Sequence, residues 1–274
     1  MDTQCTAIEM DVLLYALKKF YHMDFSHYKQ ASLHRRIIGF MEKIATPSGV
    51  ELLYQLLKDE KLFLQFLADI SVPVTEMFRD PLFFSQLRNL VLPVLNTYPT
   101  VKIWIAGCAT GEEAFSLAIL LHEENMLHKS IIYATDINQM ALDAAQLGHI
   151  TTDDLKKYQI SYGKTGGTKQ LTDYFDYHKT KYTLRADLMQ HIHFHFHNVT
   201  TGNYSSGLNL ILCRNVFIYF DQQLQNDITG FFMNSLRSGG YLCLGDKESI
   251  SHSQYTQYFE SVCNHEKIFR KRYI

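Results

Sequence analysis

Apolar side chains recur at three- and four-residue spacing through the first seventy residues. The clearest stretches are LLYQLL at 52–57 and LFLQFL at 62–67. This spacing puts the apolar positions on one face of a helix. The pattern predicts a helical N-terminal region over residues 9–69, and it predicts a further helix over 81–95.

Beyond residue 100 the pattern changes to short apolar runs of strand length. Helical periodicity separates these runs, notably over 112–124 and 138–147. The alternation of strands with helices predicts a parallel sheet that is covered on both faces. The four predicted strands are VKIWIA at 101–106, SIIYAT at 130–135, LNLILC at 208–213 and GYLCLG at 240–245.

The segment between the second and third of these strands breaks the alternation. It contains a glycine pair, many tyrosines and the run HIHFHFHN. We expect residues 151–197 to contain a small antiparallel β insertion, and we expect Glu266–Tyr273 to form an edge strand. The expected class is α/β, with a helical domain over 1–70 followed by a sheet domain over 71–274.

Composition and charge exclude several classes of function and of site for this chain. The chain has 26 basic and 28 acidic residues, and its net charge of -2 gives no overall field that attracts nucleic acid. The first residues lack the basic and apolar regions of a signal peptide, and no apolar run approaches the roughly 20 residues of a membrane span. We therefore expect a cytoplasmic protein without nucleic-acid partners or membrane insertion. Its five cysteines are scattered without a C-x-x-C pair, so they indicate neither a zinc ribbon nor a disulfide framework.

Four histidines alternate with apolar residues at the end of the inserted segment. The alternation places His191, His193, His195 and His197 on one face of a strand. An H-x-H pair can bind a metal, but no nearby carboxylate or cysteine completes a tetrahedral set. We expect no metal site, and we expect a half-exposed strand whose histidines face water or the insertion.

A glycine-rich turn with two glutamates follows the first predicted strand. Gly107 and Gly111 fit the turn at which the backbone approaches a ligand in open α/β sheets, although an ordinary tight turn has the same pattern. A dinucleotide would place its pyrophosphate at the following helix N-terminus, where Glu112 and Glu113 would repel it. A cationic adenosine cofactor without phosphate, such as S-adenosylmethionine, is compatible with these carboxylates. Complementarity to the helix dipole is the alternative explanation, above all for Glu112.

Asp136 ends the second predicted strand, at the roughly 20 to 30 residues beyond the glycine turn that are typical of a ribose-binding acid. A carboxylate at that position can accept both ribose hydroxyls. An N-cap role is the alternative, because a helical pattern begins directly after it. We expect Asp136 to bind ribose.

Motif-like segments recur along the chain, namely VTEMFRDPLFF at 74–84, IWIAGCATGEEAFSLAI at 103–119, IYATDIN at 132–138, LILCRNVFIYFD at 210–221 and LRSGGYLCLGDKESI at 236–250. Together with the basic stretch YKQASLHRRI at 28–37, their order and spacing resemble one family, the CheR-type chemoreceptor glutamate methyltransferases. The resemblance extends over nearly the whole chain.

The resemblance implies a Rossmann-like methyltransferase sheet preceded by a helical domain that docks the substrate. The implied reaction transfers a methyl group from S-adenosylmethionine to glutamate carboxylates of a protein, usually the cytoplasmic helices of a chemoreceptor. We also expect a monomer. The cofactor-binding residues that the comparison of segments implies are Thr75, Arg79, Gly107, Glu113, Asp136, Asn198, Val199, Cys213, Arg214 and Asn215.

One position departs from the family pattern. Pro73 stands where the family commonly has asparagine, so a side-chain amide and a backbone donor are absent there. This substitution puts one cofactor contact in doubt. It also leaves open the alternative that the protein binds the cofactor or a signalling partner without catalysing a reaction.

The chemistry of carboxylate methylation places modest demands on the protein. Glutamate has an ordinary pKa of about 4.3, so it is ionised at neutral pH and needs no strong base. The protein accelerates the reaction by aligning the acceptor oxygen with the methyl group and the sulfur, and by excluding water from the nucleophile. We expect Arg79 to orient the acceptor carboxylate and Tyr219 to donate a hydrogen bond near the sulfonium. The alternatives are an ion pair of Arg79 with Asp80 or another neighbour, and a core position for Tyr219.

A helix over 29–44 would carry basic residues beside an apolar stripe. Lys29, Arg36 and Lys43 share one face of this helix. We expect Lys29, Arg35 and Arg36 to dock glutamate-rich receptor helices by charge, although a solvated basic face is the simpler explanation.

Two other enzyme classes remain to be weighed. An oxidoreductase with a nicotinamide dinucleotide fits the same fold class, but the missing third glycine and the paired glutamates disfavour it. A methyltransferase that acts on another protein or on a small molecule stays open, because surfaces that the sequence barely specifies select the acceptor.

Overall fold

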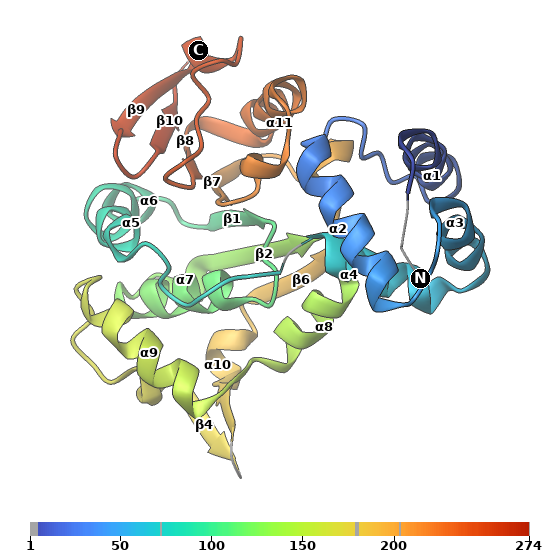
Figure 1. Cartoon of the computed structure of the whole chain (residues 1–274). Helices are drawn as coiled ribbons and strands as arrows, with labels where there is room; N and C mark the ends of the chain where they lie inside the picture. Colours follow the sequence, from blue (N-terminus) through green and yellow to red (C-terminus); the bar gives the residue numbers. More distant parts are fainter. Residues whose placement is uncertain (1–4, 72, 179–180, 203, 274) are drawn as a thin grey trace.

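The computed structural model describes residues 5–71, 73–178, 181–202 and 204–273. A group of four helices lies beside a larger domain that is built on a seven-stranded sheet (Figure 1). Among the described helices, none combines the length and the apolar character that crossing a membrane requires.

Four amphipathic helices form the N-terminal region, as the apolar spacing predicts. Their apolar faces meet in a common core that includes the fully buried Leu13, Ile37, Leu56 and Phe66. Thr6 starts the first helix with a capping box, in which its side chain and that of Glu9 each accept a backbone N–H. The helices are α1 (Ala7–Tyr21), α2 (Gln30–Lys43), α3 (Gly49–Lys58) and α4 (Glu60–Ser71).

The second domain contains one large, mostly parallel sheet. In spatial order its strands are β6 (Ile192–Phe196), β2 (Ser130–Asp136), β1 (Val101–Ala106), β7 (Leu208–Cys213), β8 (Leu236–Leu244), β10 (Ile268–Lys271) and β9 (Phe259–Cys263). Strands β6 to β8 run parallel, and β10 and β9 pair in antiparallel fashion. Because β2 lies on one side of β1 and β7 on the other, the strand order reverses at β1.

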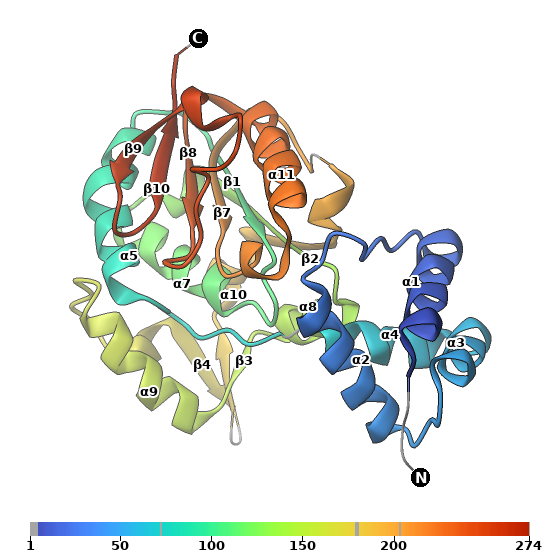
Figure 2. The ribbon, with the colours of Figure 1, turned by 45° about the horizontal axis from the view of Figure 1, so that its top comes forward.

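Alternate side chains of β1 fill two cores, one on each face of the sheet. Ile103 and Ile105 pack with α7 (Glu112–Glu123), whereas Trp104 packs with α11 (Gln222–Ser235). Figures 1 and 2 show these two helices on opposite sides of the sheet. The prediction of a parallel sheet covered on both faces is confirmed.

The remaining helices surround this sheet. The predicted helix over 81–95 is present, but a π-helical turn at Leu87–Val91 divides it. The other helices are α5 (Pro81–Gln86), α6 (Leu92–Leu95), α8 (Gln139–Leu147), α9 (Thr152–Gly163) and α10 (Ala186–Met189).

The expected insertion forms a separate antiparallel sheet at one end of the domain (Figure 1). It has three strands, in the order β3 (His149–Ile150), β5 (Lys181–Leu184) and β4 (Phe175–His178). The prediction of a small β insertion is therefore confirmed.

Two strands differ from the expectations. The histidine run forms β6 of the large sheet instead of belonging to the insertion, because Ile192 and Phe194 pack into the main core and the strand pairs with β2. The C-terminal strand β10 is not an edge strand, since it lies between β8 and β9. Its Ile268 and Phe269 are both buried, one in each of the two cores on opposite faces of the sheet.

An ion-pair network joins the insertion to the rest of the domain. Arg88, in the π-helical turn, pairs with Glu123 at 2.5 Å and also with Glu124. The hydroxyl groups of Tyr162 and Tyr174 donate hydrogen bonds to Glu123 as well. Burial alone would raise the pKa of Glu123, but these donors and the Arg88 charge hold it below its ordinary value.

Replacing Arg88 with alanine should lower the free energy of unfolding by about 3–5 kcal/mol, because Glu123 then stays buried without its charged partner. Denaturant titration at pH 7 measures the change, and a loss below about 1 kcal/mol would contradict the assignment. The matched control is Lys156→Ala, whose ion pair with Asp153 is exposed and whose loss should change the free energy of unfolding by less than about 0.5 kcal/mol.

Because folding lowers the pKa of Glu123, the contribution of its ionised carboxylate to stability is complete above about pH 4.3 and disappears as the pH falls through the folded-state pKa.

Candidate active site

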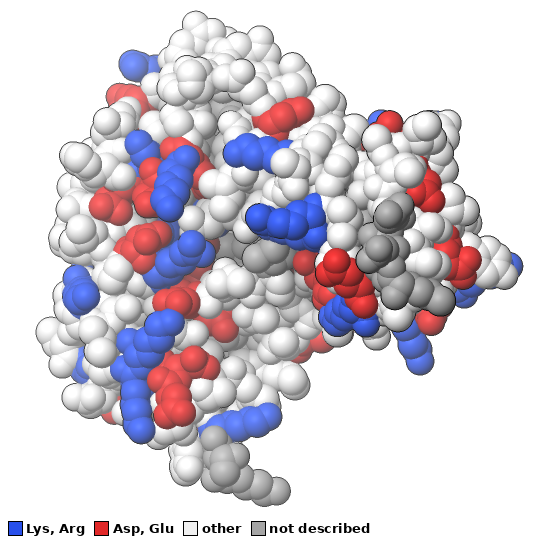
Figure 3. Space-filling view, in the orientation of Figure 1, with Lys and Arg blue, Asp and Glu red and all other residues white. Residues whose placement is uncertain are grey.

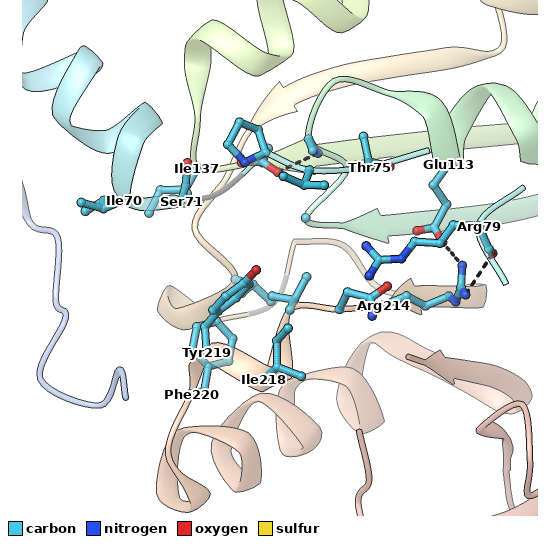
Figure 4. A pocket seen from close by; sticks show the side chains of 18 of the residues that line it. Ile70, Ser71, Thr75, Arg79, Glu113, Ile137, Arg214, Ile218, Tyr219 and Phe220 are labelled. Atoms are coloured by element: carbon cyan, nitrogen blue, oxygen red, sulfur yellow. Dashed lines mark hydrogen bonds and ion pairs between the residues drawn. The ribbon is translucent and has the colours of Figure 1, made fainter. Parts of the chain in front are cut away.

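A cavity of about 200 Å³ opens where the helical region meets the carboxyl ends of β1, β2 and β7. This edge is where open α/β sheets bind ligands. Figure 4 shows Ile70 and Ser71 of α4 on one side of the cavity and Glu113 and Arg214 on the other. Both parts of the chain therefore contribute to its walls.

The glycine turn after β1 forms one of these walls. Gly107 has a φ of +84°, and a Cβ at this position would lie 2.5 Å from Cγ2 of Val216. Ala109, Asp80 and Asn215 also have positive φ values, on loops that carry cavity residues. Non-glycine residues in this conformation are strained, and such strain concentrates at functional sites.

Asp136 ends β2 and lines the cavity, as the sequence predicts. One carboxylate oxygen accepts the N–H of Ala109 at 2.8 Å, and the other accepts the N–H of Asn138 at 2.9 Å. Burial raises the pKa of Asp136, and these N–H groups partly oppose that effect. The N-cap of α8 is Asn138, so the capping alternative for Asp136 is wrong.

Arg214 forms the most buried charged contact of the site. Its side chain is 3% exposed, and it donates to Glu113 at 2.6 Å and to Asp80 at 2.7 Å. The guanidinium also lies 4.0 Å from the ring centre of Phe83. Glu113 lines the cavity, and no described residue donates to its Oε2 atom. Arg214 thus fixes one oxygen of Glu113 and leaves the other for a ligand.

Arg79 and Tyr219 lie on opposite sides of the same space (Figure 4). Within the described part of the chain no carboxylate pairs with Arg79, because Asp80 pairs with Arg214 instead. The alternative of an Arg79–Asp80 ion pair is therefore wrong. Tyr219 is only partly buried and lines the cavity, so it is not a core aromatic.

The cavity gathers the predicted cofactor residues with one exception. Thr75 and the Asn198–Val199 pair line it together with the residues above. The exception is Cys213, whose side chain is fully buried in the core beneath α11 and does not line the cavity.

The predicted docking residues separate into two groups. Lys29 and Arg35 are exposed, as expected. Arg36 instead faces the cavity, because its Nη1 donates to the carbonyl of Ile70 at 2.7 Å and its guanidinium lies 4.8 Å from the Tyr219 ring. The expectation that Arg36 shares an outward basic face with Lys29 is wrong.

A glutamate that was not predicted from the sequence also shapes the site. Glu248 is buried after β8, and its carboxylate accepts the N–H groups of Asn215, Ile218 and Gly245. It therefore fixes the loop that carries Tyr219. Its only signal in the sequence is its place in the segment LRSGGYLCLGDKESI.

The histidine run does not form a metal site in the described residues. His193 and His195 are exposed, as predicted, whereas His197 is half-buried and lines the cavity. Within the described ranges no cluster of three or more His, Cys, Asp or Glu side chains is arranged to bind a metal ion.

Two family models match this chain. The CheR methyltransferase SAM-binding domain matches residues 73–268, and the CheR methyltransferase all-alpha domain matches residues 8–71. The chain belongs to the CheR methyltransferase family. Its cofactor is S-adenosylmethionine, and the cavity fits this cation because the carboxylates of Glu113 and Asp136 line it.

Relatives in several bacteria agree with this family. A Pseudomonas putida protein named "Putative methyltransferase Cher3" is 40% identical over 266 residues, which are 97% of each chain. The chemotaxis protein methyltransferase of Listeria innocua is 29% identical and covers 89% of this chain and 91% of its own. Chemotaxis protein methyltransferase 1 of Pseudomonas aeruginosa is 28% identical and covers 82% of this chain and 84% of its own.

Gly107→Ala should weaken S-adenosylmethionine binding at least tenfold and lower the free energy of unfolding by about 1–2 kcal/mol. The alanine Cβ would clash with Val216 and would be strained at a φ of +84°. Calorimetric titration and denaturant unfolding measure the two effects. Gly39→Ala in α2 is the control, since a Cβ there meets no atom within 4 Å and helix propensity favours alanine. Unchanged affinity in Gly107→Ala would show that the turn does not contact the cofactor.

Proposed function

We propose that this CheR family member transfers the methyl group of S-adenosylmethionine to glutamate carboxylates of a chemoreceptor, and that it acts as a monomer in the cytoplasm. The observation that supports this acceptor is the Arg79 guanidinium. It lies in the cavity opposite Tyr219, and no described carboxylate pairs with it. A substrate carboxylate would complete the missing ion pair.

In this proposal different cavity residues bind different parts of the cofactor. Asp136 accepts the ribose hydroxyls, and the Oε2 atom of Glu113 accepts the amino group. Asn198 and Val199 flank the adenine, where Asn198 is held by its bonds to the Thr200 N–H and hydroxyl. Thr75, Arg79, Gly107, Arg214 and Asn215 complete the cofactor site, and Cys213 contributes only through the end of its strand.

When bound, S-adenosylmethionine supplies an electrophilic methyl group on a positive sulfur. The acceptor glutamate is already ionised, so the protein aligns it and excludes water instead of removing a proton. Arg79 holds the carboxylate in line with the methyl group. Tyr219 donates a hydrogen bond near the sulfur, and its ring is fixed by the Arg36 guanidinium above it.

Docking of the receptor uses exposed basic residues at the N-cap and in the first half of α2. Figure 3 shows acidic and basic side chains mixed over the sheet domain, so charge attraction must act locally. Lys29 and Arg35 are the exposed members of the predicted docking set. They would meet the glutamate-rich helices of a receptor.

Incubation with labelled S-adenosylmethionine and receptor fragments should form base-labile methyl esters on glutamate. Arg79→Ala should reduce the rate about 100-fold, because a misaligned carboxylate reacts slowly. Arg237→Ala is the matched control, since this exposed arginine stacks on Tyr98 away from the cavity. Near-normal turnover in Arg79→Ala would exclude its orienting role, and methylation of another acceptor alone would exclude the receptor substrate.

High salt should inhibit methylation of the receptor and leave S-adenosylmethionine binding nearly unchanged, because only receptor docking uses exposed charges. The double variant Lys29→Ala/Arg35→Ala should raise the KM for the receptor about tenfold at low salt. Lys156→Ala is the control, as an exposed lysine on the sheet domain. Equal salt dependence of receptor methylation in the double variant and the unmodified protein would contradict docking through Lys29 and Arg35.

A further inference from the structure

The connection between α1 and α2 pairs directly with the loop that carries Tyr219. Lys29 donates its N–H to the carbonyl of Tyr219 at 2.8 Å, and Asp221 donates its N–H to the carbonyl of His27 at 2.8 Å. The pairing is a short antiparallel bridge centred on Tyr28 and Phe220. A segment of the helical region is thereby fixed to the wall of the cofactor cavity.

Tyr28 occupies the centre of this bridge and lines the cavity. Its ring packs edge-on against Phe220 at 5.0 Å and against Phe25 at 5.1 Å. Backbone pairing and two aromatic contacts therefore determine where the ring lies. The neighbouring wall also includes the helical region, because Asn198 Nδ2 lies 3.9 Å from the sulfur of Met23.

The hydroxyl group of Tyr28 has no hydrogen-bond partner among the described residues, although its ring is held firmly. Burial raises the pKa of this phenol, and the nearby Asp136 and Asp24 carboxylates raise it further. The group therefore stays protonated and remains a donor at neutral pH. The hydroxyl is accessible from the cavity that Tyr28 lines, so a ligand bound there can accept its hydrogen in place of water.

Asp136 and Tyr28 offer complementary groups to the same ligand. An ionised carboxylate only accepts hydrogen bonds, whereas a phenol donates one. A ribose has hydroxyl groups that both donate and accept, so it satisfies the two residues together.

We propose that Tyr28 is a further cofactor-binding residue, which donates its hydroxyl hydrogen to a ribose hydroxyl of S-adenosylmethionine beside Asp136. This inference rests on the proposed role of Asp136 as the ribose ligand. It makes the helical region part of the cofactor site as well as a docking surface.

The test compares Tyr28→Phe with the unmodified protein by calorimetric titration. S-Adenosylhomocysteine should bind the variant about 2- to 12-fold more weakly, which is the usual value of one hydrogen bond. Its 2′,3′-dideoxy analogue has no ribose hydroxyl, so it should bind both proteins equally. Equal weakening for the two ligands, or no weakening for S-adenosylhomocysteine, would overturn the inference.

Two further variants separate the ways in which the test can fail. Tyr21→Phe is the control, because its hydroxyl donates to the carbonyl of Leu56 inside the helical core and should not affect either ligand. Asp136→Asn should weaken S-adenosylhomocysteine selectively. If Asp136→Asn has this effect and Tyr28→Phe does not, only the role of Tyr28 is wrong; if neither does, the proposed ribose site is wrong. An unchanged midpoint of thermal unfolding for Tyr28→Phe excludes a purely structural cause.

Discussion

The buried guanidinium of Arg214 is the constraint on which the site depends. A charge that is almost completely removed from water requires paired, hydrogen-bonded partners. Arg214 obtains them from the first turn of α7, through Glu113, and from the segment before α5, through Asp80. Three segments that are far apart in the sequence must therefore come together before the cavity exists. Asp80 and Asn215, in two of the converging segments, have positive φ values, which aspartate and asparagine adopt more readily than other non-glycine residues.

The second constraint is the loop after β7. Glu248 accepts two of its backbone N–H groups from one side, and the connection before α2 pairs with it from the other. Tyr219 lies between these two supports. Since one support comes from the helical region, movement of that region relative to the sheet would change the position of Tyr219. Backbone hydrogen bonds thus join the helical region directly to the loop that carries Tyr219.

Much of this arrangement could be predicted from the sequence, because strand periodicity and motif order are local signals. They gave the parallel sheet, the insertion and the cavity positions of Gly107, Glu113 and Asp136. Local signals say little about which partner satisfies a charge. The sequence pattern predicts Arg36 as a surface residue, because it does not show the contacts of Arg36 with the carbonyl of Ile70 and the Tyr219 ring. Glu248 was missed for the same reason, since its three donors come from loops that only the fold assembles.

The charges that line the cavity favour the anionic acceptor that we propose. Three arginines line it, Arg36, Arg79 and Arg214, together with three carboxylates, Glu76, Glu113 and Asp136. The protein's own charges are therefore balanced. S-Adenosylmethionine carries one net positive charge, so the loaded cavity attracts an anion and disfavours a cationic acceptor. Attack by a carboxylate then cancels that charge within a site from which water is partly excluded, and the low polarity favours the less charged transition state. Of the three arginines, Arg214 is bound by two carboxylates and Arg36 by a carbonyl and an aromatic ring, which leaves Arg79 for the proposed acceptor.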